Sequence, residues 1–253
     1  MFEKIKEIIR EAKDIIPVNS EFELVCPDVK ERRKIIQNFK TISQNVPCPH
    51  NMSHVLTFVV EMMKYCKTYP ESKGVFVEAG CFKGGSTAKF SLVSKLLNRK
   101  MVIYDSFEGI PENKEKHQKS IFGYSIEKWF NEGSFSGGLS EVQDNVRTYG
   151  DISICSFVKG WFNETMPESD CPTRNIAGAY IDVDLASSTK TCIKYLYPRL
   201  LPGGFLVSQD GDFPLVIEVF NDDKFWEEEV GFKKPKINGL NTKKILTVYR
   251  EEQ

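Results

Sequence analysis

The feature that most constrains the fold is a repeated alternation of short apolar segments with longer helical ones, which begins at Lys73. The short segments are continuous apolar runs, and such runs separated by helices are typical of a parallel sheet covered on both faces. The pattern predicts strands at residues 74–80, 101–106, 154–158, 177–183, 204–209 and 244–250. It predicts helices between them at residues 85–97, 138–148, 187–198 and 214–228. We therefore expect an α/β fold with a doubly wound, mostly parallel sheet.

The N-terminal part of the chain has a helical pattern instead. Apolar residues within residues 1–16 fall largely on one helical face, and residues 28–39 resemble a second, polar helix. Residues 51–69 are dense enough in apolar side chains for a helix that is buried on one broad side. We therefore divide the chain into an N-terminal helical extension, residues 1–50, that caps a main domain of residues 51–253.

Charge, hydropathy and cysteine usage limit the kinds of partner and the cellular compartment that we expect for this chain. Lys and Arg number 34 against 35 Asp and Glu, and no segment carries a long run of one sign, so nucleic acid gains no electrostatic support. No stretch approaches the roughly 18 apolar residues of a membrane span, and the N-terminus lacks the apolar core of a signal peptide. The seven cysteines are scattered and form no CxxC pair, which favours free thiols in a reducing cytoplasm. We expect a cytoplasmic protein with a small-molecule partner and no membrane or nucleic-acid partner.

Polar or glycine-rich loops follow five of the predicted strands. In chain order they read "EAGCFKGGST", "DSFEGIP", "VKGWF", "DVD" and "SQDGD". Ligands of doubly wound sheets bind at the carboxyl ends of the strands, beside the point where the strand order switches. The five loops therefore predict one common ligand site at that edge of the sheet.

The first of these loops runs from a strand through Gly80, Gly84 and Gly85 into a helix. Its G-x-x-x-G-G spacing departs from the G-x-G-x-x-G of dinucleotide binding and lacks the G-K-[ST] of a phosphate-binding loop, so a pyrophosphate ligand is disfavoured. Asp105 ends the second strand, where an acid can accept hydrogen bonds from ribose hydroxyls. The two features predict an adenosine-containing ligand. The alternative is that the glycines only shape a turn and Asp105 caps a loop.

Five ordered motifs extend this prediction to a family. "VEAGCFKGGSTA", "YDSFEGIP", "FVKGWFNETMP", "YIDVDL" and "YPRLLPGGF" resemble the macrocin O-methyltransferase family of class I S-adenosylmethionine-dependent methyltransferases, across roughly residues 50–225. The resemblance implies a Rossmann-like fold and methyl transfer from S-adenosylmethionine to a hydroxyl of a small molecule, often a sugar of a natural product or a phenol. It also implies a magnesium ion in the site and a homodimer.

The resemblance carries the family's cofactor contacts onto particular positions of this chain. These cofactor-binding residues are Glu78, Ala79, Gly80, Cys81, Gly84, Gly85, Ser86, Asp105, Ser106, Lys159, Gly160, Trp161 and Asp182.

Asp182 and Asp184 give the site its expected chemistry. In an extended stretch residues i and i+2 face the same side, so both carboxylates can point into one site. Carboxylate oxygens suit magnesium, and a nearby carboxylate can remove a proton from a hydroxyl. We expect Asp182 to be a metal ligand and Asp184 to be the general base or a second ligand. The alternative is that the two acids only cap the following helix.

The other metal ligands are expected from "VSQDGD". Asp210 lies at the family's second acidic position, whereas Gln209 stands where the first acid is expected. A glutamine still offers a carbonyl oxygen, but one negative ligand fewer should weaken the affinity for a cation. Asp212 could replace it, and a plain turn is the alternative for the whole segment.

Several other interpretations stay open at this point. Cys48, His50 and His54 could form part of a zinc site, although no fourth ligand is evident. The chain could be an S-adenosylmethionine-binding protein whose metal site has lapsed and which has no turnover. It could also be a nicotinamide-dependent oxidoreductase, against which the missing G-x-G-x-x-G counts. His117 lies in the polar stretch "ENKEKHQKS" and is expected to be solvated, with a mobile lid over the acceptor site as the alternative.

Overall fold

The computed structural model describes residues 18–167 and 174–251. The helix predicted within residues 1–16 therefore lies outside the described residues, as does Cys171. Within the described part of the chain, no helix is both long enough and apolar enough to pass through a membrane.

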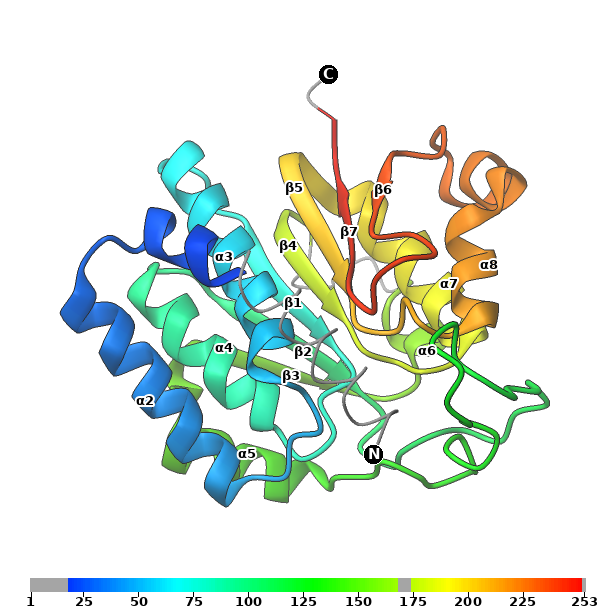
Figure 1. Ribbon diagram of the computed structural model, residues 1–253, viewed down its shortest axis with the longest axis horizontal. Helices are drawn as coiled ribbons and strands as arrows, with labels where there is room; N and C mark the ends of the chain where they lie inside the picture. Colours follow the sequence, from blue (N-terminus) through cyan, green and yellow to red (C-terminus); the bar gives the residue numbers. More distant parts are fainter. Residues whose placement is uncertain (1–17, 168–173, 252–253) are drawn as a thin grey trace.

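A twisted sheet of seven strands forms the centre of the molecule (Figure 1). Its strand order is β3-β2-β1-β4-β5-β7-β6. The strands are β1 (Val75–Ala79), β2 (Met101–Asp105), β3 (Cys155–Lys159), β4 (Ile176–Ile181), β5 (Leu200–Ser208), β6 (Ile237–Asn238) and β7 (Leu246–Tyr249). The first five are parallel, and β7 runs antiparallel to both β5 and β6. This confirms the predicted doubly wound, mostly parallel sheet.

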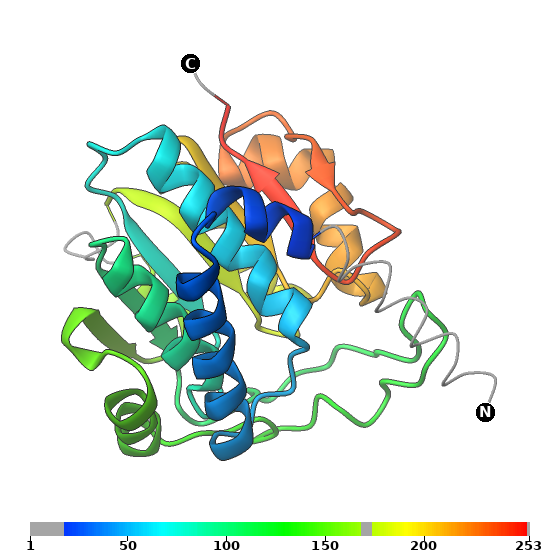
Figure 2. The same ribbon diagram turned by 60° about the vertical axis from the view of Figure 1, so that its left-hand side comes forward.

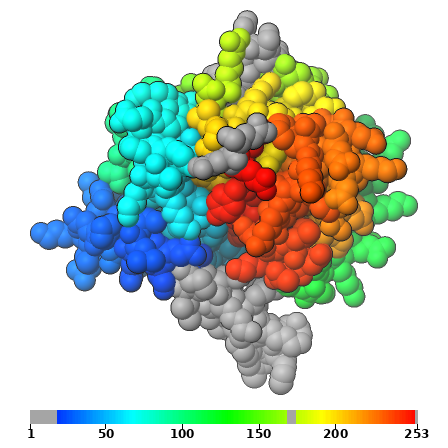
Figure 3. All heavy atoms as spheres, turned by 90° about the horizontal axis from the view of Figure 1, so that it is seen from above, coloured from blue at the N-terminus to red at the C-terminus, as the bar shows by residue number. Residues whose placement is uncertain are grey.

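Helices cover both faces of the sheet, in two groups (Figure 1). One face carries α2 (Val29–Asn45), α3 (Met52–Thr68), α4 (Gly85–Leu96) and α5 (Leu139–Tyr149). The other carries α6 (Phe162–Thr165), α7 (Ala186–Leu196) and α8 (Pro214–Asn221). In Figure 3 the blue and cyan segments and the orange segment accordingly lie on opposite sides of the central yellow and red strands. Short helical turns at η1 (Ile152–Ile154) and η2 (Tyr197–Arg199) lead into β3 and β5.

Aromatic side chains fill the core between the sheet and the first group of helices. Phe58 of α3 lies with its ring centroid 6.2 Å from that of Phe76 on β1 and 5.5 Å from that of Phe205 on β5. Phe39 and Ile42 of α2 belong to the same buried cluster. The helix α2 is therefore held by the core of the sheet, because burying such side chains contributes roughly 1.5–3 kcal/mol each.

The C-terminal part differs from the prediction in two places. The helix predicted at 214–228 ends at Asn221 and is followed by a separate π-helical turn, η3 (Phe225–Val230). The Asp222 carboxylate accepts hydrogen bonds from the backbone N–H groups of Lys224 and Phe225, and such a local acceptor competes with helix continuation. The last strand is shorter than predicted, and the two-residue strand β6 beside it was too short to leave a periodic pattern.

Candidate active site

A large cavity opens at the carboxyl ends of the strands, where the sequence predicted a site. Its volume is about 1920 Å³. It lies at the switch in strand order, because β2 and β3 extend from β1 to one side and β4 and β5 extend to the other. Ligand pockets usually measure about 300–1,000 Å³, so this cavity has room for two small molecules side by side.

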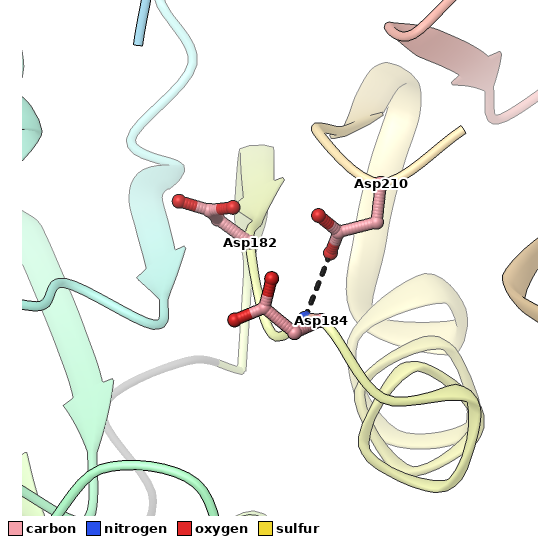
Figure 4. A group of neighbouring side chains, drawn as sticks. All are labelled: Asp182, Asp184 and Asp210. Atoms are coloured by element: carbon pink, nitrogen blue, oxygen red, sulfur yellow. Dashed lines mark hydrogen bonds between the residues drawn. The ribbon is translucent and has the colours of Figure 1, made fainter. Parts of the chain in front are cut away.

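Three carboxylates stand together on one wall of the cavity. Asp182 and Asp184 follow β4, and Asp210 follows β5 (Figure 4). One ligand atom from each lies within 4.8 Å of the others. The i, i+2 prediction for Asp182 and Asp184 is consistent with this arrangement, although the chain leaves the extended conformation at Asp184, whose φ is +61°.

The end of β5 fixes this turn. Asp210 Oδ2 accepts hydrogen bonds of 3.0 Å from the backbone N–H groups of both Val183 and Asp184 (Figure 4). A non-glycine residue with positive φ is uncommon and persists where its surroundings hold it. Asp210 therefore holds the turn that carries Asp184.

The electrostatics of the three acids favour a cation among them. Burial and the neighbouring Asp182 raise the pKa of Asp210, and burial together with Asp210 raises that of Asp184. Close carboxylates that lose water disfavour one another's ionised form. Their donor set consists of oxygen atoms only, which fits a hard divalent cation such as Mg²⁺. The residues present therefore fit the metal that the resemblance implies.

His50 and His54, which the zinc interpretation places in one site, contact different residues beside the acids. His50 Nε2 lies 2.8 Å from Asp182 Oδ2, and His54 Nδ1 lies 3.1 Å from Gln209 Nε2. Cys48 turns elsewhere, with its sulfur 3.3 Å from the buried Lys89 Nζ. Because these side chains have different partners, the structure gives no support to the zinc alternative.

Gln209 is buried, and both the oxygen and the nitrogen of its side-chain amide have a partner. Its Oε1 accepts a 2.9 Å hydrogen bond from the Tyr180 hydroxyl while Nε2 faces His54. An acid at this position would place a further buried charge beside Asp210, whereas the amide is uncharged and contacts both Tyr180 and His54. The case for a metal in this chain consequently rests on the three aspartates.

The glycine loop lies directly against the acidic cluster. Gly80 has a φ of +83°, and a Cβ added there would stand 1.9 Å from the backbone oxygen of Asp182. Only glycine satisfies both conditions. The loop is braced by Asp105, whose Oδ2 and Oδ1 accept 2.7 Å hydrogen bonds from the N–H groups of Cys81 and Phe107. Burial raises the pKa of Asp105, and these backbone donors oppose that shift.

The residues predicted to bind the cofactor divide into two sets. Those that line the cavity are Gly80, Asp105, Ser106, Gly160, Trp161 and Asp182. Those that lie outside its lining are Glu78, Ala79, Cys81, Gly84, Gly85, Ser86 and Lys159. Pro47 and Cys48 cover Gly85, where a Cβ would meet the Cys48 Cβ at 2.7 Å.

Glu78 supports the loop from inside the sheet. It is fully buried, and its Oε2 accepts a 2.6 Å hydrogen bond from the Thr87 hydroxyl on α4. Burial raises its pKa to about 8, so the carboxyl is mostly protonated at neutral pH. Glu78 thus connects β1 to the start of α4 beneath the glycine loop.

The segment of residues 107–137 forms the outer wall of the cavity and projects from the body of the molecule in green in Figure 2. Tyr124 and Trp129 stack with ring centroids 5.6 Å apart. The Tyr124 hydroxyl donates to Asp212, whose other oxygen lies 2.9 Å from Lys244 Nζ. Asp212 is therefore engaged by these partners and does not join the aspartate cluster.

Lys244 also lines the cavity, although no motif of the sequence marks it. Burial alone would lower its pKa, but the carboxylates of Asp212 and Asp210 outweigh that effect and raise it. Its position before β7, far along the chain from its partners, leaves no local pattern by which to recognise it. The Asp212 that it pairs with was considered only as a metal ligand.

The same outer segment is fastened to α7 through Glu115. Its two carboxylate oxygens accept 2.8 Å hydrogen bonds from the N–H groups of Ala186 and Ser187, at the start of that helix. Burial acts to raise the pKa of Glu115, but hydrogen bonds from His117 and Ser187 lower it to about 2. His117 was expected to be solvated, and this was wrong: it is buried, with Nε2 3.1 Å from Glu115 and its ring against Phe130.

Comparison with known proteins gives a consistent family match. The family model described as macrocin-O-methyltransferase (TylF) matches residues 61–235, more than half of the chain. A tetracenomycin-C 4'-O-methyltransferase of Streptomyces olivaceus is 31% identical over 159 residues, which cover 60% of this chain and 59% of that protein. The mycinamicin III 3''-O-methyltransferase of Micromonospora griseorubida is 27% identical over 153 residues, 59% of each chain. These matches span less than two thirds of the relatives' length.

Solved structures share the fold. The O-methyltransferase NovP superposes with a TM-score of 0.55 at 20% identity, covering 89% of this chain and 81% of that one. The calicheamicin methyltransferase CalS11 superposes with a TM-score of 0.60 at 18% identity, covering 89% of this chain and 95% of that one. These superpositions cover a larger share of the chain than the family-model match over residues 61–235.

Proposed function

The chain belongs to the macrocin O-methyltransferase family, and from this premise we propose that it transfers a methyl group from S-adenosylmethionine to a hydroxyl group of a small molecule. The observation that carries the proposal is the contact between the glycine loop and the acidic cluster, in which the backbones of Gly80 and Asp182 are too close for any other side chain at position 80. A donor site and a deprotonation site thus adjoin in one cavity.

The cofactor half of the cavity lies at the ends of β1, β2 and β3. Asp105 and Ser106 line it beside Gly80, and Gly160 and Trp161 follow β3. We propose that Asp105 accepts hydrogen bonds from the ribose hydroxyls with the lone pairs that its backbone donors leave, and that Trp161 contacts the adenine. When bound, S-adenosylmethionine supplies an electrophilic methyl group.

The acceptor half lies at the ends of β4 and β5 under the outer segment 107–137. A hydroxyl group is a poor nucleophile until its proton is at least partly removed. We propose that Asp182 and Asp210 hold Mg²⁺, and that Asp184 accepts the proton or is a third ligand. A bound divalent cation lowers the pKa of a neighbouring hydroxyl. Asp210 also keeps Asp184 in place through the backbone hydrogen bond described above.

We extend this proposal to the acceptor, the cellular compartment and the oligomeric state. The relatives are named as O-methyltransferases of a rhamnosyl-tetracenomycin, of mycinamicin III and of demethyldecarbamoylnovobiocin. We propose a natural-product acceptor for this chain too, with a sugar or a phenol hydroxyl. We also propose a cytoplasmic homodimer. Free cysteines support the reducing compartment, and six of them are described. Sedimentation equilibrium of the purified chain tests the dimer.

Isothermal titration separates this function from the alternatives. We expect S-adenosylhomocysteine to bind and NAD⁺ not to bind, because the loop lacks a pyrophosphate site. We also expect Mg²⁺ to bind the wild type and to bind an Asp182→Asn variant more weakly. Cofactor binding without any binding of Mg²⁺ would instead favour a protein with a lapsed metal site. Binding of NAD⁺ in place of S-adenosylhomocysteine would favour an oxidoreductase.

A further inference from the structure

A second, smaller cavity of about 310 Å³ lies in the outer segment and adjoins the main one. We call it the side pocket. Four glutamates, two asparagines, His117 and Phe130 line it. Two of the glutamates, Glu112 and Glu132, also line the main cavity, so the two cavities share a wall. The side pocket is therefore a neighbour of the main cavity on the outer segment.

The charged residues of the outer segment are unevenly placed: the side pocket has only acidic ones in its lining, whereas Lys128 lines the main cavity. Glu112, Glu115, Glu127 and Glu132 line the pocket, and no lysine or arginine of the described chain does. The lysines at 114, 116 and 119 are exposed and line neither cavity. Acidic side chains gathered around a concave surface focus a negative potential into it.

His117 provides a separate reason to expect a ligand. Its side chain is only 1% exposed, and its Nε2 contacts the Glu115 carboxylate. Its Nδ1 is buried without a hydrogen-bond partner among the described residues. Nε2 is occupied by Glu115, so Nδ1 is the ring nitrogen that remains for a ligand. A buried polar atom of this kind costs free energy unless a ligand or water satisfies it.

Aromatic rings connect the pocket to the acceptor half. The Phe130 ring centroid lies 4.6 Å from that of His117 and 6.4 Å from that of Trp129, which in turn stacks on Tyr124. Trp129 is 43% exposed and lines the main cavity. Aromatic faces attract cations, and carboxylates beside them strengthen that attraction.

We propose that the side pocket binds an organic ammonium group carried by the acceptor, so that the substrate is an amine-bearing hydroxyl compound. The inference rests on the proposed methyl transfer and specifies its substrate class. An ammonium group suits this lining, because it donates hydrogen bonds to several carboxylates, carries the opposite charge and accepts none itself. A neutral hydroxyl substituent brings no charge to balance the glutamates.

The test compares two probes that differ in this group alone. Tyramine carries a phenol and an ammonium group, and 4-hydroxyphenethyl alcohol replaces the ammonium with a hydroxyl. Titrated at low ionic strength into the full chain with S-adenosylhomocysteine present, tyramine should bind about tenfold more tightly than the alcohol. Equal affinities, or no binding of either probe, would overturn the proposal.

Two variants test whether the side pocket causes the preference for tyramine over the alcohol. In Glu127→Gln/Glu132→Gln the ratio of the two affinities should fall toward one, because two exposed pocket carboxylates lose their charge. The matched control is Glu228→Gln, an exposed acid on η3 that lines neither cavity, and it should keep the wild-type ratio. An unchanged ratio in the double variant would place the ammonium elsewhere and reject the side pocket. Binding of S-adenosylhomocysteine, measured first in each protein, reports separately on the proposed methyl transfer.

Discussion

Asp210 Oδ2 holds the backbone N–H of Asp184 at 3.0 Å, so the acid that ends β5 fixes the turn carrying the acids that follow β4. The same oxygen accepts the N–H of Val183. The turn that carries Asp184 is thus held by hydrogen bonds from the segment after β4 to the acid after β5. Mutations of Asp210 can therefore separate the effect of its charge from the effect of the backbone hydrogen bonds that it accepts.

Replacing Asp210 with asparagine should separate them. The asparagine carbonyl can still accept the two backbone N–H groups, so the melting temperature should stay within a few degrees of the wild type. Loss of the charge should weaken Mg²⁺ or Mn²⁺ binding by at least about tenfold. Calorimetric titration of the metal and a thermal melt measure the two effects.

The Asp210→Ala variant should in addition lower the free energy of unfolding by about 1–3 kcal/mol, because it leaves buried N–H groups unpaired. Wild-type metal affinity in Asp210→Asn would exclude Asp210 as a ligand.

His50 should set the orientation of Asp182. Its Nε2 lies 2.8 Å from Asp182 Oδ2 on a side chain that is 7% exposed. His50→Ala should weaken metal binding by about 10- to 100-fold, as removal of a ligand's hydrogen-bond partner usually does. His50→Gln can still donate to the carboxylate and should recover part of this loss. A glutamine variant no better than the alanine one would show that the contact does not position Asp182.

Asp105 should matter for the cofactor and little for the metal. Asp105→Asn keeps one acceptor oxygen for the loop but removes the charge offered to ribose hydroxyls, so the Kd of S-adenosylhomocysteine should rise by roughly 10- to 100-fold. Metal affinity should be unchanged. Asp144→Asn, an exposed acid on α5 that lines neither cavity, is the matched control. A similar loss in both variants would point to a nonspecific charge effect.

Glu78 should make the stability of the ligand-free protein depend on pH. Its pKa rises from an ordinary value of 4.5 to about 8 because it is buried. A folded-state pKa above the unfolded value means that the native state binds more protons, so this contribution is full below pH 4.5 and is lost as pH rises toward 8. Glu78→Gln removes the titration and should flatten the stability profile between about pH 5 and pH 8, by on the order of a few kcal/mol. Thermal melts against pH, with the exposed Glu141→Gln as control, measure this. An unchanged slope in Glu78→Gln would contradict a protonated Glu78.

The sequence allowed the parallel sheet, the glycine loop and the Asp182 and Asp184 pair to be predicted because each leaves a local pattern. A continuous apolar strand, a glycine at a positive φ and two acids after a strand can all be recognised within a few residues. The position of the cavity followed from the topology that these strands imply. The family resemblance added the cofactor and the metal.

Contacts between distant parts of the chain could not be predicted in this way. His50 meets Asp182 across more than a hundred residues, and Lys244 meets Asp212 across 32 residues. His117 looked solvated because its neighbours in the sequence are charged, yet Glu115 bonds to α7 and carries His117 inward with it. Nothing local distinguishes such a histidine from an exposed one.

The most direct measurement is a crystal structure of the chain grown with S-adenosylhomocysteine and Mn²⁺, with anomalous scattering used to locate the metal. The expected result is adenosine against Asp105 and Trp161, and an anomalous peak among Asp182, Asp184 and Asp210. An adenosine bound away from Asp105, or a fully occupied cofactor with no anomalous peak at the three aspartates, would contradict a metal-assisted methyl transfer in this cavity.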